Sequence, residues 1–177
     1  MTTANKITIV RVILVPVLVL LMYLDFPGHI YWALAVFVIA SLSDFADGYI
    51  ARHYDQVSDF GKFMDPLADK VLVLAAMAVF VEWGVMPAWV LIIVLAREFA
   101  VSGLRLVAVD NGRVIAAAWS GKIKTGCTMV GIILMMLIGI PQEIDWLNTA
   151  VCIIIAVTTV YSGAEYFIKN KDVLSFK

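Results

Sequence analysis

Six long apolar runs, separated by short polar breaks, constrain the fold of this chain more than any other feature. A helix needs about 20 mainly apolar residues to cross the hydrocarbon core of a bilayer. The candidate spans are Ile7–Leu24, Ile30–Ile50, Met64–Phe80, Ala88–Ala108, Ala116–Ile140 and Trp146–Ile168. Of the 177 residues, 63% are hydrophobic and 15% are charged, which is more apolar surface than one water-exposed globule can bury. The pattern predicts an all-α polytopic membrane protein with six transmembrane helices.

This composition also excludes several classes of protein. A soluble enzyme, a disordered chain, a disulfide scaffold and a nucleic-acid binder are all incompatible with so apolar a chain. Cys127 and Cys152 both lie inside apolar runs, which favours packing roles over a disulfide. Because the sequence shows no soluble domain, low-complexity segment or internal repeat, we expect residues 1–177 to form a single transmembrane domain.

The distribution of lysine and arginine predicts the orientation in the membrane. The breaks after the first, third and fifth spans contain acidic residues but no lysine or arginine, and all thirteen basic residues lie elsewhere. Basic residues are retained on the cytoplasmic side of a membrane. We therefore expect a multi-pass protein of the cell membrane with both termini in the cytoplasm.

Four aspartates lie where the second predicted span ends and the third begins. Asp44 and Asp47 are three residues apart, and Asp65 and Asp69 are four apart, so each pair occupies one helix face. The short break between the two spans brings both pairs to the cytoplasmic edge of the membrane. Helix capping explains Asp44 and Asp47 poorly, because acids near a helix C-terminus and within an apolar zone are unfavourable. A functional site at this edge is the better interpretation.

Four ionised carboxylates at one place repel each other strongly unless protons or cations neutralise them. Two divalent cations would balance the four charges, and ligation by oxygen alone favours Mg²⁺ or Mn²⁺ over zinc. Two such ions about 3.5–4 Å apart would form a clamp for a phosphoryl group. The aspartates therefore predict a site for two divalent metals, with Asp44, Asp47, Asp65 and Asp69 as ligands.

The same segment resembles the signature of the CDP-alcohol phosphotransferase family. The pattern D-x-x-D-G-x-x-A-R, then eight residues, then G-x-x-x-D-x-x-x-D, is matched without departure at Asp44, Asp47, Gly48, Ala51, Arg52, Gly61, Asp65 and Asp69. The resemblance extends over essentially the whole chain. It implies a transferase of phospholipid biosynthesis, an active site that faces the cytoplasm and a homodimer.

In that family, the hydroxyl of an alcohol attacks the lipid-side phosphorus of a CDP-linked lipid and displaces CMP. The resemblance implies that Asp44, Asp47 and Asp65 bind the metals, and that Asp69 contacts a metal and acts as general base. It also implies a set of residues that bind the CDP-lipid, namely Asn5, Thr8, Arg11, Gly48, Ala51, Arg52, Ser58 and Gly61. Small residues let a nucleotide approach the helix backbone, and an arginine fork fits a phosphate.

Basic residues in the fourth and fifth spans indicate the acceptor. Arg97 lies mid-span beside Glu98, and Arg105, Lys122 and Lys124 lie closer to the cytoplasm. One glutamate cannot neutralise four basic groups, and a buried arginine is costly unless it is paired or lines a wet cavity. These four residues therefore predict a pocket for a phosphorylated acceptor. The alternative is that Arg97 pairs with Glu98 or with a motif aspartate, and that the lysines only mark the cytoplasmic side.

Four strings resemble the branch of the family that uses sn-glycerol 3-phosphate and produces phosphatidylglycerol phosphate: Gly61–Lys70, Ala96–Phe99, Ser102–Arg105 and Gly121–Thr125. The substrates are then expected to be CDP-diacylglycerol and glycerol 3-phosphate, in contact with membrane lipids and without nucleic acid. Other acceptors stay open, such as an inositol phosphate, an unphosphorylated alcohol or phosphatidylglycerol. A cation transporter is a weaker alternative, because transporter sites usually lie near the midplane at a repeat interface.

Overall fold

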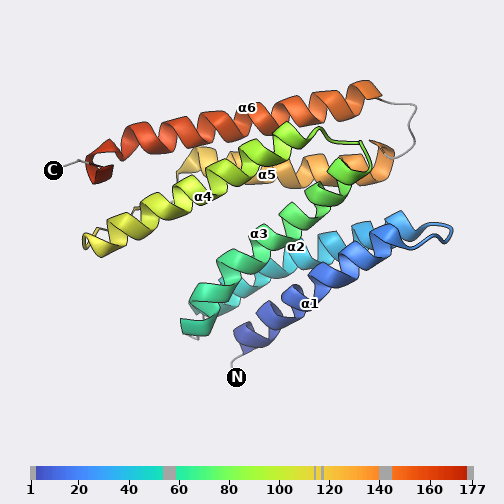
Figure 1. Cartoon of the computed structure of the whole chain (residues 1–177). Helices are drawn as coiled ribbons and strands as arrows, with labels where there is room; N and C mark the ends of the chain where they lie inside the picture. The colour runs from blue at the N-terminus through green and yellow to red at the C-terminus, as the bar shows by residue number, and fades with distance from the viewer. Residues whose placement is uncertain (1–2, 54–58, 114, 117, 140–144, 175–177) are drawn as a thin grey trace.

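The structure is a computed structural model that describes residues 3–53, 59–113, 115–116, 118–139 and 145–174 (Figure 1). Within these ranges, the side chains are described except at residues 3–7, 44–53, 59–63, 65–66, 69, 138–139, 145 and 174. The described chain forms six α-helices: α1 (Thr3–Tyr23), α2 (His29–His53), α3 (Asp59–Glu82), α4 (Ala88–Asp110), α5 (Trp119–Leu134) and α6 (Asp145–Lys169). A π-helix, η1 (Met135–Gly139), continues α5, and a short 3₁₀ helix, η2 (Lys171–Leu174), follows α6.

Each helix contains most of one predicted apolar run, so the all-α prediction is confirmed for the described residues. Several bounds differ by a few residues, and two of these differences have a clear local cause. Helix α3 begins at Asp59, before the apolar run that starts at Met64, because backbone hydrogen bonds continue a helix into polar sequence. Helix α5 begins only at Trp119, since the backbone of Ala118 before it is extended (φ −71°, ψ 147°).

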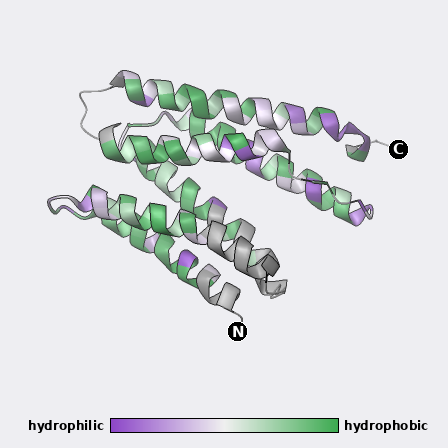
Figure 2. Cartoon of the chain, turned by 180° about the vertical axis from the view of Figure 1, so that it is seen from behind, coloured by the Kyte–Doolittle hydropathy of each residue, from purple (hydrophilic) through white to green (hydrophobic). Residues whose placement is uncertain are grey.

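The surface of the helices is suited to lipid. Two stretches, Trp119–Leu137 and Trp146–Lys169, are long and apolar enough to cross a membrane, and Thr8–Tyr23 and His29–Ser43 are shorter apolar helices. Large apolar side chains such as Trp32, Leu106 and Ile168 are exposed, which is costly in water over so wide an area. Figure 2 shows hydrophobic residues along most of the helices and hydrophilic ones gathered near the C-terminal ends of α4 and α6. The fold fits a membrane protein, and the six spans and their orientation stay predictions.

The helices form two groups of three. Helix α1 packs against α2 and α3, and α6 packs against α4 and α5. Helix α3 joins the groups through its contacts with α4 and α5 (Figure 1). Consecutive helices run in opposite directions, so the end of α2, the start of α3, the end of α4 and the start of α5 lie toward one end of the bundle. We call this the motif end, because it includes residues 44–53 and 59–69 of the motif segment.

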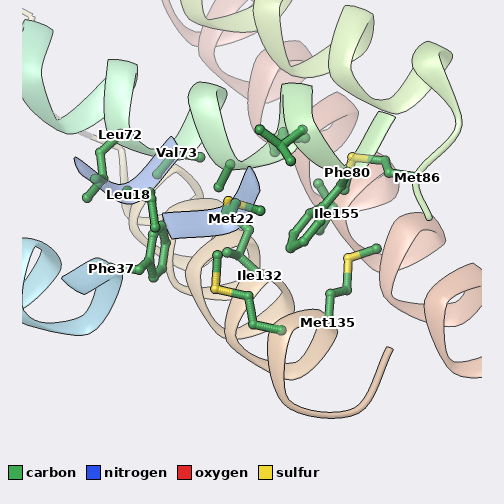
Figure 3. Close-up of a cluster of buried hydrophobic side chains, with 14 of the residues drawn as sticks. Leu18, Met22, Phe37, Leu72, Val73, Phe80, Met86, Ile132, Met135 and Ile155 are labelled. Atoms are coloured by element: carbon green, nitrogen blue, oxygen red, sulfur yellow. The ribbon is translucent and has the colours of Figure 1, made fainter. Parts of the chain in front are cut away.

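The largest core lies mostly toward the opposite end of the bundle. It contains residues from all six α-helices and η1, and Figure 3 labels ten of its side chains: Leu18, Met22, Phe37, Leu72, Val73, Phe80, Met86, Ile132, Met135 and Ile155. In lipid such a core gains stability from close packing more than from removing apolar surface from water. A second, smaller core of Val101, Leu104 and Tyr166 joins α4 to α6 nearer the motif end.

Candidate active site

The four motif aspartates lie on two helices that contact each other near the motif end. Asp44 and Asp47 belong to the last turns of α2, and Asp65 and Asp69 belong to the first turns of α3. The helical backbone keeps the predicted spacings of three and four residues, so each pair shares one helix face. The side chains of these aspartates lie outside the described residues, so the metal site itself stays a prediction.

The predicted metal ligands fit a divalent ion by their chemistry. Carboxylate oxygens are the ligands that Mg²⁺ and Mn²⁺ prefer, and the two helices that bear them pack together. Among the side chains that the structure describes, no group of three His, Cys, Asp or Glu residues could hold a metal. The four aspartates of the motif stay the predicted metal ligands.

The predicted CDP-lipid residues are described only in part. Thr8 and Arg11 on α1 are both 1% exposed, although they carry polar groups in an otherwise apolar helix. Since α1 packs against α2 and α3, both side chains face the interior of the bundle and not the lipid. The other predicted residues of this set lie outside the description: Ser58 entirely, and the side chains or surroundings of Asn5, Gly48, Ala51, Arg52 and Gly61.

Glu98 is the centre of a cationic cluster, which we define as Lys70, Arg97, Glu98 and Lys124. Oε1 of Glu98 accepts hydrogen bonds from Arg97 Nη1 at 3.0 Å and from Lys124 Nζ at 2.6 Å. Oε2 of Glu98 lies 3.5 Å from Lys70 Nζ, and Lys70 also donates to Ser102 Oγ at 2.6 Å. The cluster therefore joins α3, α4 and α5 through one carboxylate.

Arg97 reaches this cluster through a narrow space between α5 and α6. A Cβ atom added at Gly121 would lie 3.3 Å from Arg97 Nη2, and one added at Gly163 would lie 3.3 Å from Arg97 Cγ. The Nη2 group donates a hydrogen bond to Ser162 Oγ at 2.7 Å. We call Gly121 and Gly163 the glycine notch, because a larger residue at either position would press on the arginine.

The structure does not bring all four predicted acceptor residues together. Arg97 and Lys124 meet at Glu98, as one alternative prediction had it for Arg97. Arg105 instead donates from Nε to Tyr166 Oη at 2.9 Å, with its guanidinium 5.5 Å from the centre of that ring. The Nζ atom of Lys122 lies 5.3 Å from the centre of the Trp119 ring and its side chain is exposed.

Sequence reasoning missed several members of this region. Lys70 follows Asp69 directly, and Ser102 is four residues after Glu98, one helical turn along the same face. These spacings were a usable signal for both residues. The glycine notch and Ser162 carried no such signal, because they meet Arg97 only through the packing of α4, α5 and α6.

Comparison with known proteins agrees with this architecture. A family model described as CDP-alcohol phosphatidyltransferase matches residues 1–161. The chain is 40% identical to the CDP-diacylglycerol–glycerol-3-phosphate 3-phosphatidyltransferase of Bacillus subtilis, over 96% of this chain and 95% of that protein. It is 36% identical to the Escherichia coli protein of the same name, over 90% of each. A probable phosphatidylglycerophosphate synthase of Mycobacterium tuberculosis is also 36% identical, over 92% of this chain and 78% of that protein.

The chain therefore belongs to the CDP-alcohol phosphatidyltransferase family, and the predicted family resemblance is confirmed. Enzymes of this family generally depend on a divalent metal. That property agrees with the oxygen-only ligand set of the motif.

Proposed function

We propose that the chain transfers a phosphatidyl group from CDP-diacylglycerol to sn-glycerol 3-phosphate, which yields phosphatidylglycerol phosphate and CMP. The similarity to proteins named for this reaction supports the proposal. The observation that carries it within the structure is the cationic cluster. Its Lys70 is the residue next to Asp69 on α3, so positive charge for a phosphorylated acceptor lies directly beside the motif.

The reaction forms one bond and breaks one bond at phosphorus. The acceptor hydroxyl attacks the phosphorus attached to diacylglycerol, and the bond from that phosphorus to the CMP oxygen breaks. Asp69 takes the hydroxyl proton as general base. Such transfer depends on alignment and charge neutralisation more than on covalent chemistry by the protein.

Asp44, Asp47, Asp65 and Asp69 would hold two divalent cations, Mg²⁺ or Mn²⁺. When bound, these ions supply neutralising charge for the pyrophosphate oxygens. Asn5, Thr8, Arg11, Gly48, Ala51, Arg52, Ser58 and Gly61 would bind the CDP-lipid. The burial of Thr8 and Arg11 on the interior side of α1 supports this part of the proposal.

Arg97 and Lys124 would bind the acceptor phosphate, and their shared position at Glu98 supports that role. Arg105 and Lys122 complete the acceptor set that the sequence predicts. We expect them to contribute less to binding the acceptor phosphate, because Arg105 contacts Tyr166 and Lys122 contacts Trp119.

The proposed cellular setting follows from the charge pattern of the sequence. The protein crosses the cell membrane six times, with both termini and the active site on the cytoplasmic side. That it forms a homodimer follows instead from the family resemblance. The alternating helix directions gather the end of α2, the start of α3 and the ends of α4 and α6 at one end of the bundle, which supports the proposed orientation (Figure 1).

The test is CMP release by the purified protein with CDP-diacylglycerol and a panel of acceptors, with and without divalent metal. The panel contains glycerol 3-phosphate, glycerol, inositol phosphate and phosphatidylglycerol. We expect release with glycerol 3-phosphate and loss of release when a chelator removes the metal. Preference for another acceptor would overturn the proposed substrate, and metal flux in proteoliposomes without CMP release would indicate a transporter.

A further inference from the structure

Glu98 arranges three positive groups that come from three different helices. Lys70 lies on α3, Arg97 on α4 and Lys124 on α5. One oxygen of Glu98 accepts from Arg97 at 3.0 Å and from Lys124 at 2.6 Å, and the other lies 3.5 Å from Lys70. The single carboxylate balances only one of these three charges, yet it contacts all three positive groups and holds them together.

The cluster is shielded from solvent. The exposed fractions of the side chains are 13% for Arg97, 14% for Glu98 and 5% for Lys124, compared with 33% for Lys70. Buried cations at close range repel each other strongly, because little water screens them. Without the carboxylate, these groups would separate or turn toward other partners.

The glycine notch limits the path of Arg97 from the other side. Gly121 and Gly163 each leave only enough space for the arginine side chain, and Ser162 accepts a hydrogen bond from its Nη2 atom at 2.7 Å. Among the residues that the structure describes, buried Arg97 Nε has no hydrogen-bond partner. A buried donor of this kind is unfavourable unless a ligand or water accepts from it.

We propose that Glu98 is a positioning residue for the acceptor: it holds Lys70, Arg97 and Lys124 in a fixed array that fits the dianionic phosphate of a phosphomonoester, while the glycine notch fixes the path of Arg97. This inference rests on the proposed function and extends it to specificity. A neutral alcohol gains nothing from such an array. A phosphodiester brings one negative charge where a phosphomonoester brings two.

Replacing Glu98 tests the inference through the sign of the effect. If Glu98 only competes with the acceptor for the cations, Glu98→Gln tightens anion binding, because it removes a negative charge. If Glu98 positions the cations, the same change weakens binding. We expect Glu98→Gln to raise the KM for glycerol 3-phosphate at least about tenfold, the loss typical of one charge-assisted hydrogen bond, and to leave the KM for CDP-diacylglycerol within about twofold.

Glu98→Asp is the conservative variant. It keeps the charge but shortens the side chain, so a positioning role predicts a KM for glycerol 3-phosphate between those of the unsubstituted protein and Glu98→Gln. A role in charge alone predicts nearly full rescue by aspartate. The split between the two KM values separates either role from general damage to the fold.

Glycine variants give a second test that avoids removing a charge. Gly121→Ala and Gly163→Ala would displace Arg97 by a few tenths of an ångström. Gly126→Ala on α5 and Gly103→Ala on α4 are the matched controls, because a Cβ at either position meets nothing within 4 Å. We expect the notch variants to raise the KM for glycerol 3-phosphate about threefold or more, since catalytic sites tolerate little misplacement, and the controls to leave it unchanged.

Each outcome decides the inference. An unchanged or lowered KM for glycerol 3-phosphate in Glu98→Gln overturns the positioning role, as do notch variants that behave like Gly126→Ala and Gly103→Ala. If Glu98→Gln cannot be recovered as a folded protein, the notch variants decide alone. Failure of the proposed function is recognised separately, because the unsubstituted protein would then not use glycerol 3-phosphate.

Discussion

Arg97 and Arg105 are two arginines on the same helix with different surroundings. They lie two turns apart on α4, yet Arg97 is largely buried against Glu98 and Ser162, and Arg105 contacts Tyr166. The sequence predicts both as acceptor residues, because both are arginines on one predicted helix and lie two turns apart. Only their contacts in the structure distinguish them, and these contacts make Arg97 the stronger candidate for binding the acceptor phosphate.

We predict that Arg97→Gln raises the KM for glycerol 3-phosphate by roughly ten to a hundred and fifty fold, the loss of a charge-assisted hydrogen bond worth about 1.5–3 kcal/mol. Arg105→Gln is the matched comparison on the same helix and should have a smaller effect. Acceptor titrations of CMP release measure both. Equal effects of the two substitutions on this KM would show that the contact with Glu98 does not make Arg97 the more important residue for the acceptor.

Asp44→Asn and Asp65→Asn should each abolish turnover while the protein stays folded, because each removes a charge that balances a divalent ion. CMP release across a metal titration measures the loss. Asp25→Asn is the control, since Asp25 lies exposed between α1 and α2. Near-normal activity of both motif variants at ordinary metal concentration would refute the two-metal site.

Helices α5 and α6 approach closely at Gly131. A Cβ atom added there would lie 2.8 Å from Val151 Cγ1, which is closer than real Cβ contacts, and 3.0 Å from Ile155 Cδ1, which is tighter than most of them. Gly126, on the same helix, has nothing within 4 Å of such an atom. Small residues at helix interfaces in membranes permit close packing of this kind, so the two glycines of α5 have different roles.

Gly131→Ala should therefore destabilise the protein by about 1–3 kcal/mol through overpacking. Gly126→Ala should be neutral or slightly stabilising, because alanine is the better helix former. Thermal unfolding of the purified variants in the same detergent measures the difference. Adding Val151→Ala to Gly131→Ala should recover part of the loss, and equal stability of the two single variants would contradict the packing explanation.

At the scale of the whole molecule, the two ends of the bundle differ. The end opposite the motif has a contact in which Tyr23 Oη donates to the Glu82 carboxylate, and the Tyr23 and Trp83 rings pack edge to face with their centres 6.3 Å apart. Tryptophan and tyrosine are enriched at membrane interfaces. At the motif end, hydrophilic residues gather near the C-terminal ends of α4 and α6 (Figure 2).

This asymmetry predicts the result of cysteine labelling in intact cells. Asp25→Cys should react with an impermeant thiol reagent added outside, whereas Asn111→Cys, in the exposed turn after α4, should react only after permeabilisation. Asp25 is a better position than Gly28, whose φ of +82° disfavours a side chain. The reverse labelling pattern would overturn the predicted orientation, and a reporter fused after Lys177 should agree with it by lying in the cytoplasm.

The sequence by itself determined the features that depend on one segment at a time. Apolar runs indicated all six helices, because helix formation and hydrophobic length are local properties. The spacing of the motif aspartates indicated their shared helix faces and the family, since the geometry of one helix suffices to align residues three or four apart. The positions of both aspartate pairs on α2 and α3 agree with that prediction.

Only the tertiary structure decided which charges meet. Glu98 joins Lys70 and Lys124 because α3, α4 and α5 have particular rotations and depths relative to one another, and Arg97 passes Gly121 and Gly163 for the same reason. A helix that faces lipid on one side and protein on the other is apolar on both. Its hydrophobic pattern therefore carries little information about which face turns inward, so these contacts could not be read from the sequence.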